Sequence, residues 1–248
     1  MNDNYRLPTL LVVGAGASGV AAAAECALLG YPTKVVDKQP SAGGWYLSNA
    51  DAPVVKNLGF RRRNLKHTKV KQNAESVREH IESALNHSGA ELVPNSTVTG
   101  AEFDWNDGLW NVQVEGPNET YTLRADVVIL ATGNGDTTGD NFTDGKGNRL
   151  EVSAARLHQG IEPLDSPNLL TMNGRDQFGR TAVKRPWQLI EARADHCWRY
   201  LRLLEVQGVG AIEVNKALWR VSPSTLTGAV KDLRECERST HVYTRIEQ

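Results

Sequence analysis

Three glycines and one aspartate near the N-terminus are spaced like the residues that bind the phosphates and a ribose of a dinucleotide. Residues 9–19 read Thr-Leu-Leu-Val-Val-Gly-Ala-Gly-Ala-Ser-Gly, and Asp37 follows eighteen residues after Gly19. Gly14 permits a tight turn, Gly16 lets backbone amides approach a pyrophosphate, and Gly19 lets a helix pack closely on a strand. A carboxylate such as Asp37 accepts hydrogen bonds from ribose hydroxyls. The pattern predicts a dinucleotide site, and a glycine turn without a ligand is the alternative.

The elements around these residues are those that such a site needs. Residues 10–13 form an apolar run typical of a strand buried on both faces, and residues 17–29 are good helix formers. Tyr31-Pro32 interrupts the chain before a second strand at residues 33–36, which Asp37 follows directly. The glycines therefore lie at a strand-to-helix turn, where phosphates can rest on the helix N-terminus.

The rest of the chain continues this alternation without internal repeats. Strand patterns occur at residues 92–103, 109–114, 121–123, 126–131 and 168–172, and helix patterns at residues 72–87 and 181–205. Residues 134–148 are rich in Gly, Asp, Asn and Thr, which predicts a loop. We expect an α/β fold, with a doubly wound, mainly parallel Rossmann-like sheet and a small antiparallel β layer.

Composition narrows the class of protein. The 248 residues can bury a sizeable core, and the net charge of -1 gives no reason to expect nucleic acid or an anionic membrane as partner. Cys26, Cys197 and Cys236 have neither metal-ligand spacing nor a disulfide pattern, so we expect a cytoplasmic protein without a metal site. Residues 10–30 are long and apolar enough for a membrane span, but their glycine-rich centre fits a nucleotide fold better, so we expect a soluble protein.

Four motifs together resemble the flavin-containing and Baeyer-Villiger monooxygenases. They are the loop Gly14-Ala-Gly16-Ala-Ser18-Gly19, the pair Asp37-Lys38, the element Gly43-Gly44-Trp45-Tyr46, and Ala131-Thr132-Gly133 after an apolar strand. Residues 166–181 also resemble the strand, flavin-facing loop and helix that close the FAD domain of that family. The resemblance covers about residues 9–135 and 160–220. In the family one residue separates the glycine pair from the tryptophan, whereas Trp45 follows Gly44 directly here, so either Trp45 or Tyr46 contacts the flavin.

The resemblance implies that the cofactor is FAD. The residues that it assigns to the FAD site are Gly14, Gly16, Ala17, Ser18, Gly19, Asp37, Lys38, Gly43, Gly44, Trp45, Tyr46, Val98, Ala131, Thr132, Gly133, Gly174, Asp176, Gln177 and Thr181. In such folds the backbone of Val98 touches adenine, and residues 131–133 pass beneath the nucleotide, although ordinary strand packing is the alternative for both. The isoalloxazine is expected near Gly174, Asp176 and Gln177. No catalytic residue is assigned, because in this family the flavin carries the chemistry.

One interval departs from the family. In the monooxygenases a complete NADPH domain lies between the positions of Gly133 and Pro167, whereas this chain has 33 residues there, from Asn134 to Ser166. A domain needs at least about 50 residues, so a second nucleotide domain cannot fit. We therefore expect an FAD-binding domain over residues 1–206, in which a short loop at 134–165 replaces the NADPH domain. Residues 207–248 are expected to form a tail packed on it.

Three functions are compatible with one FAD site and no NADPH domain. The first is an oxidoreductase of the flavin monooxygenase type that acts on a small organic substrate, with secondary metabolism as one setting. Its reducing equivalents would come from a separate flavin reductase, from diffusing NAD(P)H or from the substrate itself. The second is a non-redox cyclase or isomerase that keeps FAD bound, and the third is a non-catalytic flavin-binding remnant. Apolar tail positions such as Trp219 are candidates for a homodimer surface.

Overall fold

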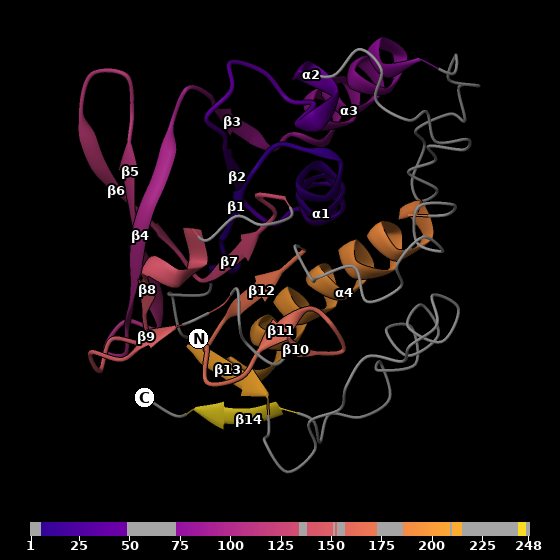
Figure 1. Ribbon diagram of the computed structural model, residues 1–248. Helices are drawn as coiled ribbons and strands as arrows, with labels where there is room; N and C mark the ends of the chain where they lie inside the picture. Colours follow the sequence, from indigo (N-terminus) through magenta and orange to yellow (C-terminus); the bar gives the residue numbers. More distant parts are fainter. Residues whose placement is uncertain are drawn as a thin grey trace.

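A five-stranded parallel sheet forms the centre of the molecule (Figure 1). The computed structural model describes residues 6–48, 73–133, 138–150, 152, 157–172, 186–208, 210–214 and 243–246. The sheet has the order β12-β7-β1-β2-β3, and all its neighbouring pairs are parallel. Its strands are β1 (Leu10–Val13), β2 (Thr33–Val36), β3 (Glu91–Val93), β7 (Val127–Leu130) and β12 (Leu169–Thr171). Since the chain runs from β1 outward to β3 and returns on the other side of β1 with β7, the strand order reverses between β1 and β7.

A second sheet of five strands is mostly antiparallel. Its order is β6-β5-β4-β8-β9, and the pair β4–β8 is parallel. The strands are β4 (Thr97–Asp104), β5 (Leu109–Glu115), β6 (Thr120–Ala125), β8 (Phe142–Thr143) and β9 (Arg149–Leu150). The other strands in the described ranges form two short antiparallel pairs. These are β10 (Leu157–His158) with β11 (Glu162–Pro163), and β13 (Ala211–Val214) with β14 (Tyr243–Ile246).

The two faces of the parallel sheet are covered differently. The helices are α1 (Ala17–Leu28), α2 (Trp45–Ser48), α3 (Ala74–Ser88) and α4 (Pro186–Gln207), with a 3₁₀ turn η1 at Thr138–Asn141. Side chains alternate along a strand, so Leu10 and Val12 of β1 pack with α1, α3 and α4, while Leu11 and Val13 pack with the second sheet. Figure 1 shows the three long helices on one side of the parallel sheet and strands β4, β5 and β6 of the second sheet on the other.

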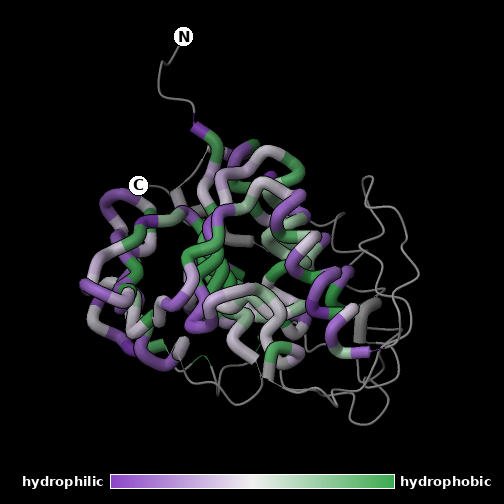
Figure 2. Tube along the Cα trace, turned by 90° about the horizontal axis from the view of Figure 1, so that it is seen from above, coloured by the Kyte–Doolittle hydropathy of each residue, from purple (hydrophilic) through white to green (hydrophobic). Residues whose placement is uncertain are grey.

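Burial follows this layering. Figure 2 shows hydrophobic segments in the middle of the molecule and hydrophilic ones toward its outside. The largest fully buried side chains include Trp110, Phe103 and Phe142, which lie between the two sheets. No helix in the described ranges is long and apolar enough to cross a membrane.

The predicted fold class is confirmed, and two boundaries were wrong. The strand expected at residues 92–103 is two strands, β3 and β4, in different sheets, because Pro94 and the left-handed Asn95 (φ 51°) break it. The loop expected at 134–148 contains η1 and β8. Phe142 of β8 is fully buried, with its ring centroid 5.5 Å from that of Trp110. A two-residue strand is too short to leave a readable period in the sequence.

Candidate cofactor site

A pocket of about 780 Å³ opens at the carboxyl edge of the parallel sheet. Val13 and Val36, the last residues of β1 and β2, line it, as does Ala131 directly after β7. Open α/β sheets bind ligands at this edge, at the point where the strand order reverses. The volume lies within the range of roughly 300–1,000 Å³ that is typical of small-molecule and cofactor sites.

The three glycines of the N-terminal loop have two different physical roles. A Cβ on Gly14 would overlap the carbonyl oxygen of Ala131, and a Cβ on Gly19 would overlap the carbonyl oxygen of Gly14. Packing within the protein therefore requires both glycines. A Cβ on Gly16 would lie 3.7 Å from the nearest atom, the Cα of Gly44, which is ordinary contact. Packing does not require a glycine at position 16, so the small residue there keeps the pocket floor open for a ligand.

The N-terminus of α1 is arranged to receive an anion. Gly16 is its N-cap, no side chain in the described part of the chain caps it, and its first turn contains no acidic residue. The helix α3 differs, because the side chain of Asn73 accepts a hydrogen bond of 2.8 Å from the amide of Ser76. The first amides of a helix need acceptors, and the helix dipole favours negative charge there. Ala17 and Ser18 line the pocket at this point, so the site fits a pyrophosphate.

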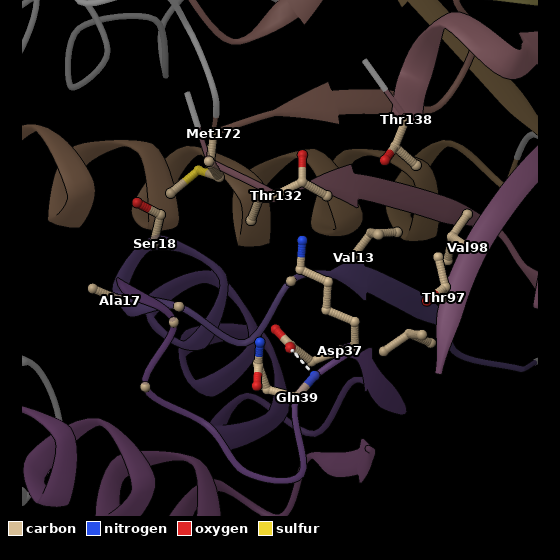
Figure 3. Close-up of a pocket in the computed structure, with 18 of the residues that line it drawn as sticks. Val13, Ala17, Ser18, Asp37, Gln39, Thr97, Val98, Thr132, Thr138 and Met172 are labelled. Carbon is tan, nitrogen blue, oxygen red and sulfur yellow. Dashed lines mark hydrogen bonds between the residues drawn. The ribbon is translucent and has the colours of Figure 1, made fainter. Parts of the chain in front are cut away.

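Asp37 is fixed at the end of β2 by two backbone amides. Its Oδ2 accepts from the amide of Ala15 at 2.5 Å. Its Oδ1 accepts from the amide of Gln39 at 2.7 Å (Figure 3). A carboxylate offers about four acceptor positions, so two bonds leave capacity for ribose hydroxyls. The Asp37 carbonyl also accepts from the amide of Ser96 at 2.9 Å, which holds Ser96, Thr97 and Val98 at the pocket wall.

The element after Asp37 folds back onto the glycine loop. The amide of Gly43 donates to the carbonyl of Ala15 at 2.9 Å, and Gly44 and Tyr46 line the pocket. Burial raises the pKa of the Tyr46 phenol, so this side chain is neutral at physiological pH. The side chain of Trp45 lies outside the described residues. Of the two aromatic candidates, the structure places Tyr46 at the pocket, and flavin contact by either stays a prediction.

Most of the predicted residues meet at this pocket. Those that line it are Gly14, Gly16, Ala17, Ser18, Asp37, Lys38, Gly43, Gly44, Tyr46, Val98, Ala131, Thr132 and Gly133. Gly19 lies behind the lining, in contact with Gly14. The predicted flavin-facing residues Gly174, Asp176, Gln177 and Thr181 lie outside the described residues.

Several lining residues were not predicted. They are Val13, Val36, Gln39, Ser96, Thr97, Thr138 and Met172. The strand pattern could have indicated Val13 and Val36, because the last residue of each central strand reaches this edge. Thr138 had no signal in the sequence, since its place depends on how η1 packs.

A buried polar group supports the end of β12 from the helix side. Arg193 of α4 is buried and donates from Nη1 to the carbonyl oxygen of Met172 at 3.0 Å. One turn further along α4, His196 forms a buried pair with Glu162 of β11. These contacts hold β11, β12 and α4 together beside the pocket. The described residues contain no group of His, Cys, Asp and Glu suited to a metal ion.

The chain was compared with protein families, with curated proteins and with solved structures. The family model described as FAD dependent oxidoreductase matches residues 9–242. This match confirms the predictions of FAD as cofactor and of an FAD-dependent oxidoreductase. A search of curated proteins finds no match.

Among solved structures, THI4 from Thermovibrio ammonificans matches with a TM-score of 0.51 and 16% identity, over 67% of this chain and 78% of that one. This likeness supports the fold. The OTEMO complex with FAD and NADP matches with a TM-score of 0.42 and 17% identity, over 52% of this chain and 26% of that one. Oxidized steroid monooxygenase bound to NADP matches with a TM-score of 0.43 and 16% identity, over 52% of this chain and 27% of that one. The chain thus covers about a quarter of the length of each of these two proteins.

Proposed function

Because this chain belongs to the family of FAD dependent oxidoreductases, we propose that it is a flavoprotein of the flavin monooxygenase type that acts on a small organic substrate. Its reducing equivalents come from outside the protein: from a separate flavin reductase, from diffusing NAD(P)H or from the substrate itself. FAD supplies the electron transfer when bound. The observation that carries the proposal is the pocket in which the uncapped start of α1, Gly16 and Asp37 meet.

In this proposal each part of the pocket holds one part of the cofactor. The amides at the start of α1 and the Ser18 hydroxyl bind the pyrophosphate, because charge-assisted bonds to backbone amides are strong. Asp37 accepts from the ribose hydroxyls while it holds the glycine loop through Ala15. Thr97 and Val98 lie at the adenine end. The protein thereby fixes the adenosine half of FAD on rigid strands and a helix.

The need for an outside reductant is supported by the length of the interval between Gly133 and Pro167 and by the strands that it contains. Part of this interval is used within the single domain, because β8 pairs with β4 and β9 pairs with β8. The interval has 33 residues, from Asn134 to Ser166, and a domain needs at least about 50. We accordingly assign residues 1–206 to one FAD-binding domain and residues 207–248 to a tail.

Anaerobic spectroscopy of the purified protein tests the proposal. The full chain is loaded with FAD, and the visible absorption of oxidised flavin is followed after addition of NADPH, of NADPH with a flavin reductase, or of candidate substrates. Bleaching by any of these is the expected result. Bound flavin that none of them bleaches would favour a non-redox use of FAD, and a protein that binds no FAD would overturn the proposal. The variant Gly16→Ala is the control for flavin bound outside the pocket.

A further inference from the structure

We propose that the turn η1 (Thr138–Asn141) forms a wall of the adenosine site, and that Thr138 contacts the adenosine part of the cofactor. The inference rests on the proposed FAD site. Thr138 lines the same pocket as Asp37 and Val98, although 101 residues separate it from Asp37 in sequence. The turn η1 thus reaches the same pocket as the residues proposed to bind adenosine.

The position of Thr138 relates it to the adenosine end. Figure 3 shows its side chain on the side of Val13 and Val98, away from Asp37 and Gln39. The turn η1 also lies against β4, the strand that begins with Thr97 and Val98. A threonine hydroxyl donates one hydrogen bond and accepts others, which suits a ribose hydroxyl or a ring nitrogen. Thr138 therefore stands opposite Asp37 across the adenosine position.

The turn η1 packs against the core between the two sheets. Gly139 is buried, and a Cβ there would lie 2.6 Å from Cδ1 of Leu130 and 2.9 Å from Cβ of Val152. Phe142 is fully buried at the other end of η1, where β8 pairs with β4 in the register Ala101 to Phe142. Since both ends of η1 are held by the core between the sheets, Thr138 is presented to the pocket on a rigid support.

Arg149 of β9 holds the outer side of the same turn. Its Nε donates to the carbonyl oxygen of Asp140 at 2.5 Å, and its Nη2 donates to Oδ1 of Asn141 at 2.5 Å. These bonds cross from β9 to the last residues of η1. Arg149 is therefore a positioning residue for the wall, and Thr138 is the residue that touches the ligand.

Ligand binding to matched variants tests the inference. Thr138→Val keeps the shape of the side chain and removes the hydroxyl, Thr138→Ser restores a hydroxyl, and Thr143→Val is the control in β8, outside the pocket lining. The affinities of the full chain for FAD, ADP and FMN are measured by calorimetry. We expect Thr138→Val to bind both FAD and ADP about 3- to 10-fold more weakly, the value for one neutral hydrogen bond. Thr138→Ser and Thr143→Val should bind as the wild type does.

Three outcomes would overturn the inference. Wild-type affinity of Thr138→Val for FAD and ADP would exclude the contact, and a loss for FAD and FMN without one for ADP would place Thr138 at the flavin instead. A wild-type chain that binds neither FAD nor ADP would overturn the proposed function and this inference with it. If Thr138→Val fails to fold, Arg149→Ala replaces it, because release of the wall should weaken ADP binding. Unchanged ADP binding by Arg149→Ala would then count against the wall.

Discussion

The turns after β1 and β7 leave neighbouring parallel strands at the same edge of the sheet, but they lead to different structures. Val13 and Leu130 are register partners at the ends of these two strands. The first turn continues into the twelve residues of α1, whereas the second is followed at Thr138 by a four-residue 3₁₀ turn. Only a helix of several turns has an appreciable dipole and a row of free amides at its start. The first turn can therefore bind a pyrophosphate, and the second can supply a wall.

The glycines of the two turns separate packing from ligand binding. Gly14 and Gly19 are required because a side chain would overlap backbone atoms of the protein. Gly16 and Gly133 would meet no such obstacle, and both line the pocket. Packing thus requires glycine at two positions of the N-terminal loop and does not require it at Gly16. Substitution of Gly19 should therefore affect stability and substitution of Gly16 should affect FAD binding, and this separation can be measured.

The largest effect on stability is expected from Gly19→Ala. The new Cβ would overlap the carbonyl oxygen of Gly14, and neither backbone can move without separating α1 from β1. We expect the free energy of unfolding to fall by roughly 3 to 5 kcal/mol, as for severe overpacking of a core. Urea unfolding followed by circular dichroism measures it, with Gly16→Ala as the control in the same loop. A loss below about 1 kcal/mol would show that the loop is more yielding than the structure indicates.

Gly16→Ala should have the opposite profile. The backbone at Gly16 (φ -76°, ψ -178°) is open to alanine, so stability should fall by at most about 1 kcal/mol, the value of a poorer N-cap. The added methyl group keeps the pyrophosphate from the first amides of α1. Loss of such charge-assisted bonds should weaken FAD binding about 100-fold, or about 2.7 kcal/mol. Fluorescence titration of the apoprotein with FAD measures this. Unchanged affinity would mean that the pyrophosphate does not lie on α1.

The β1–α1–β2 unit could be predicted because its determinants are local. The apolar run of β1, the spacing of Gly14, Gly16 and Gly19, and Asp37 at the end of β2 are all readable along the chain. Each of these features works through neighbouring residues or through the turn itself. This explains why most lining residues on that side of the pocket were predicted.

The wall on the β7 side could not be predicted, because it depends on contacts between distant parts of the chain. Phe142 belongs to a strand because it packs against Trp110, 32 residues earlier, and because β8 pairs with β4. The glycine- and aspartate-rich sequence around it indicates a loop by local propensity. Tertiary packing overrides that propensity, and it also brings Thr138 to the pocket.

Asp37→Asn tests the proposed hydrogen bonds between the carboxylate at the end of β2 and the ribose of FAD. An asparagine amide nitrogen would face the amide of Ala15 or of Gln39, both of which need an acceptor. We expect FAD binding to weaken about 10- to 30-fold, with a loss of stability near 1 kcal/mol. Asp107→Asn is the control, because Asp107 forms an exposed ion pair with Arg124 and is not among the lining residues. Equal affinities of the two variants would exclude Asp37 from the ribose site.

The smallest effect is expected from Gly133→Ala, which tests the β7 turn itself. Gly133 has φ +99° and no atom within 4 Å of a new Cβ, so alanine adds backbone strain alone, about 1 kcal/mol. Gly30 is a matched control with φ +94°, equally open surroundings and a place outside the lining. Both variants should lose similar stability, and FAD affinity should stay within about threefold of wild type because no charge-assisted bond is lost. A loss at Gly133 as large as that at Gly16 would mean that both turns bind phosphate, and the contrast between the helix start and the wall would fail.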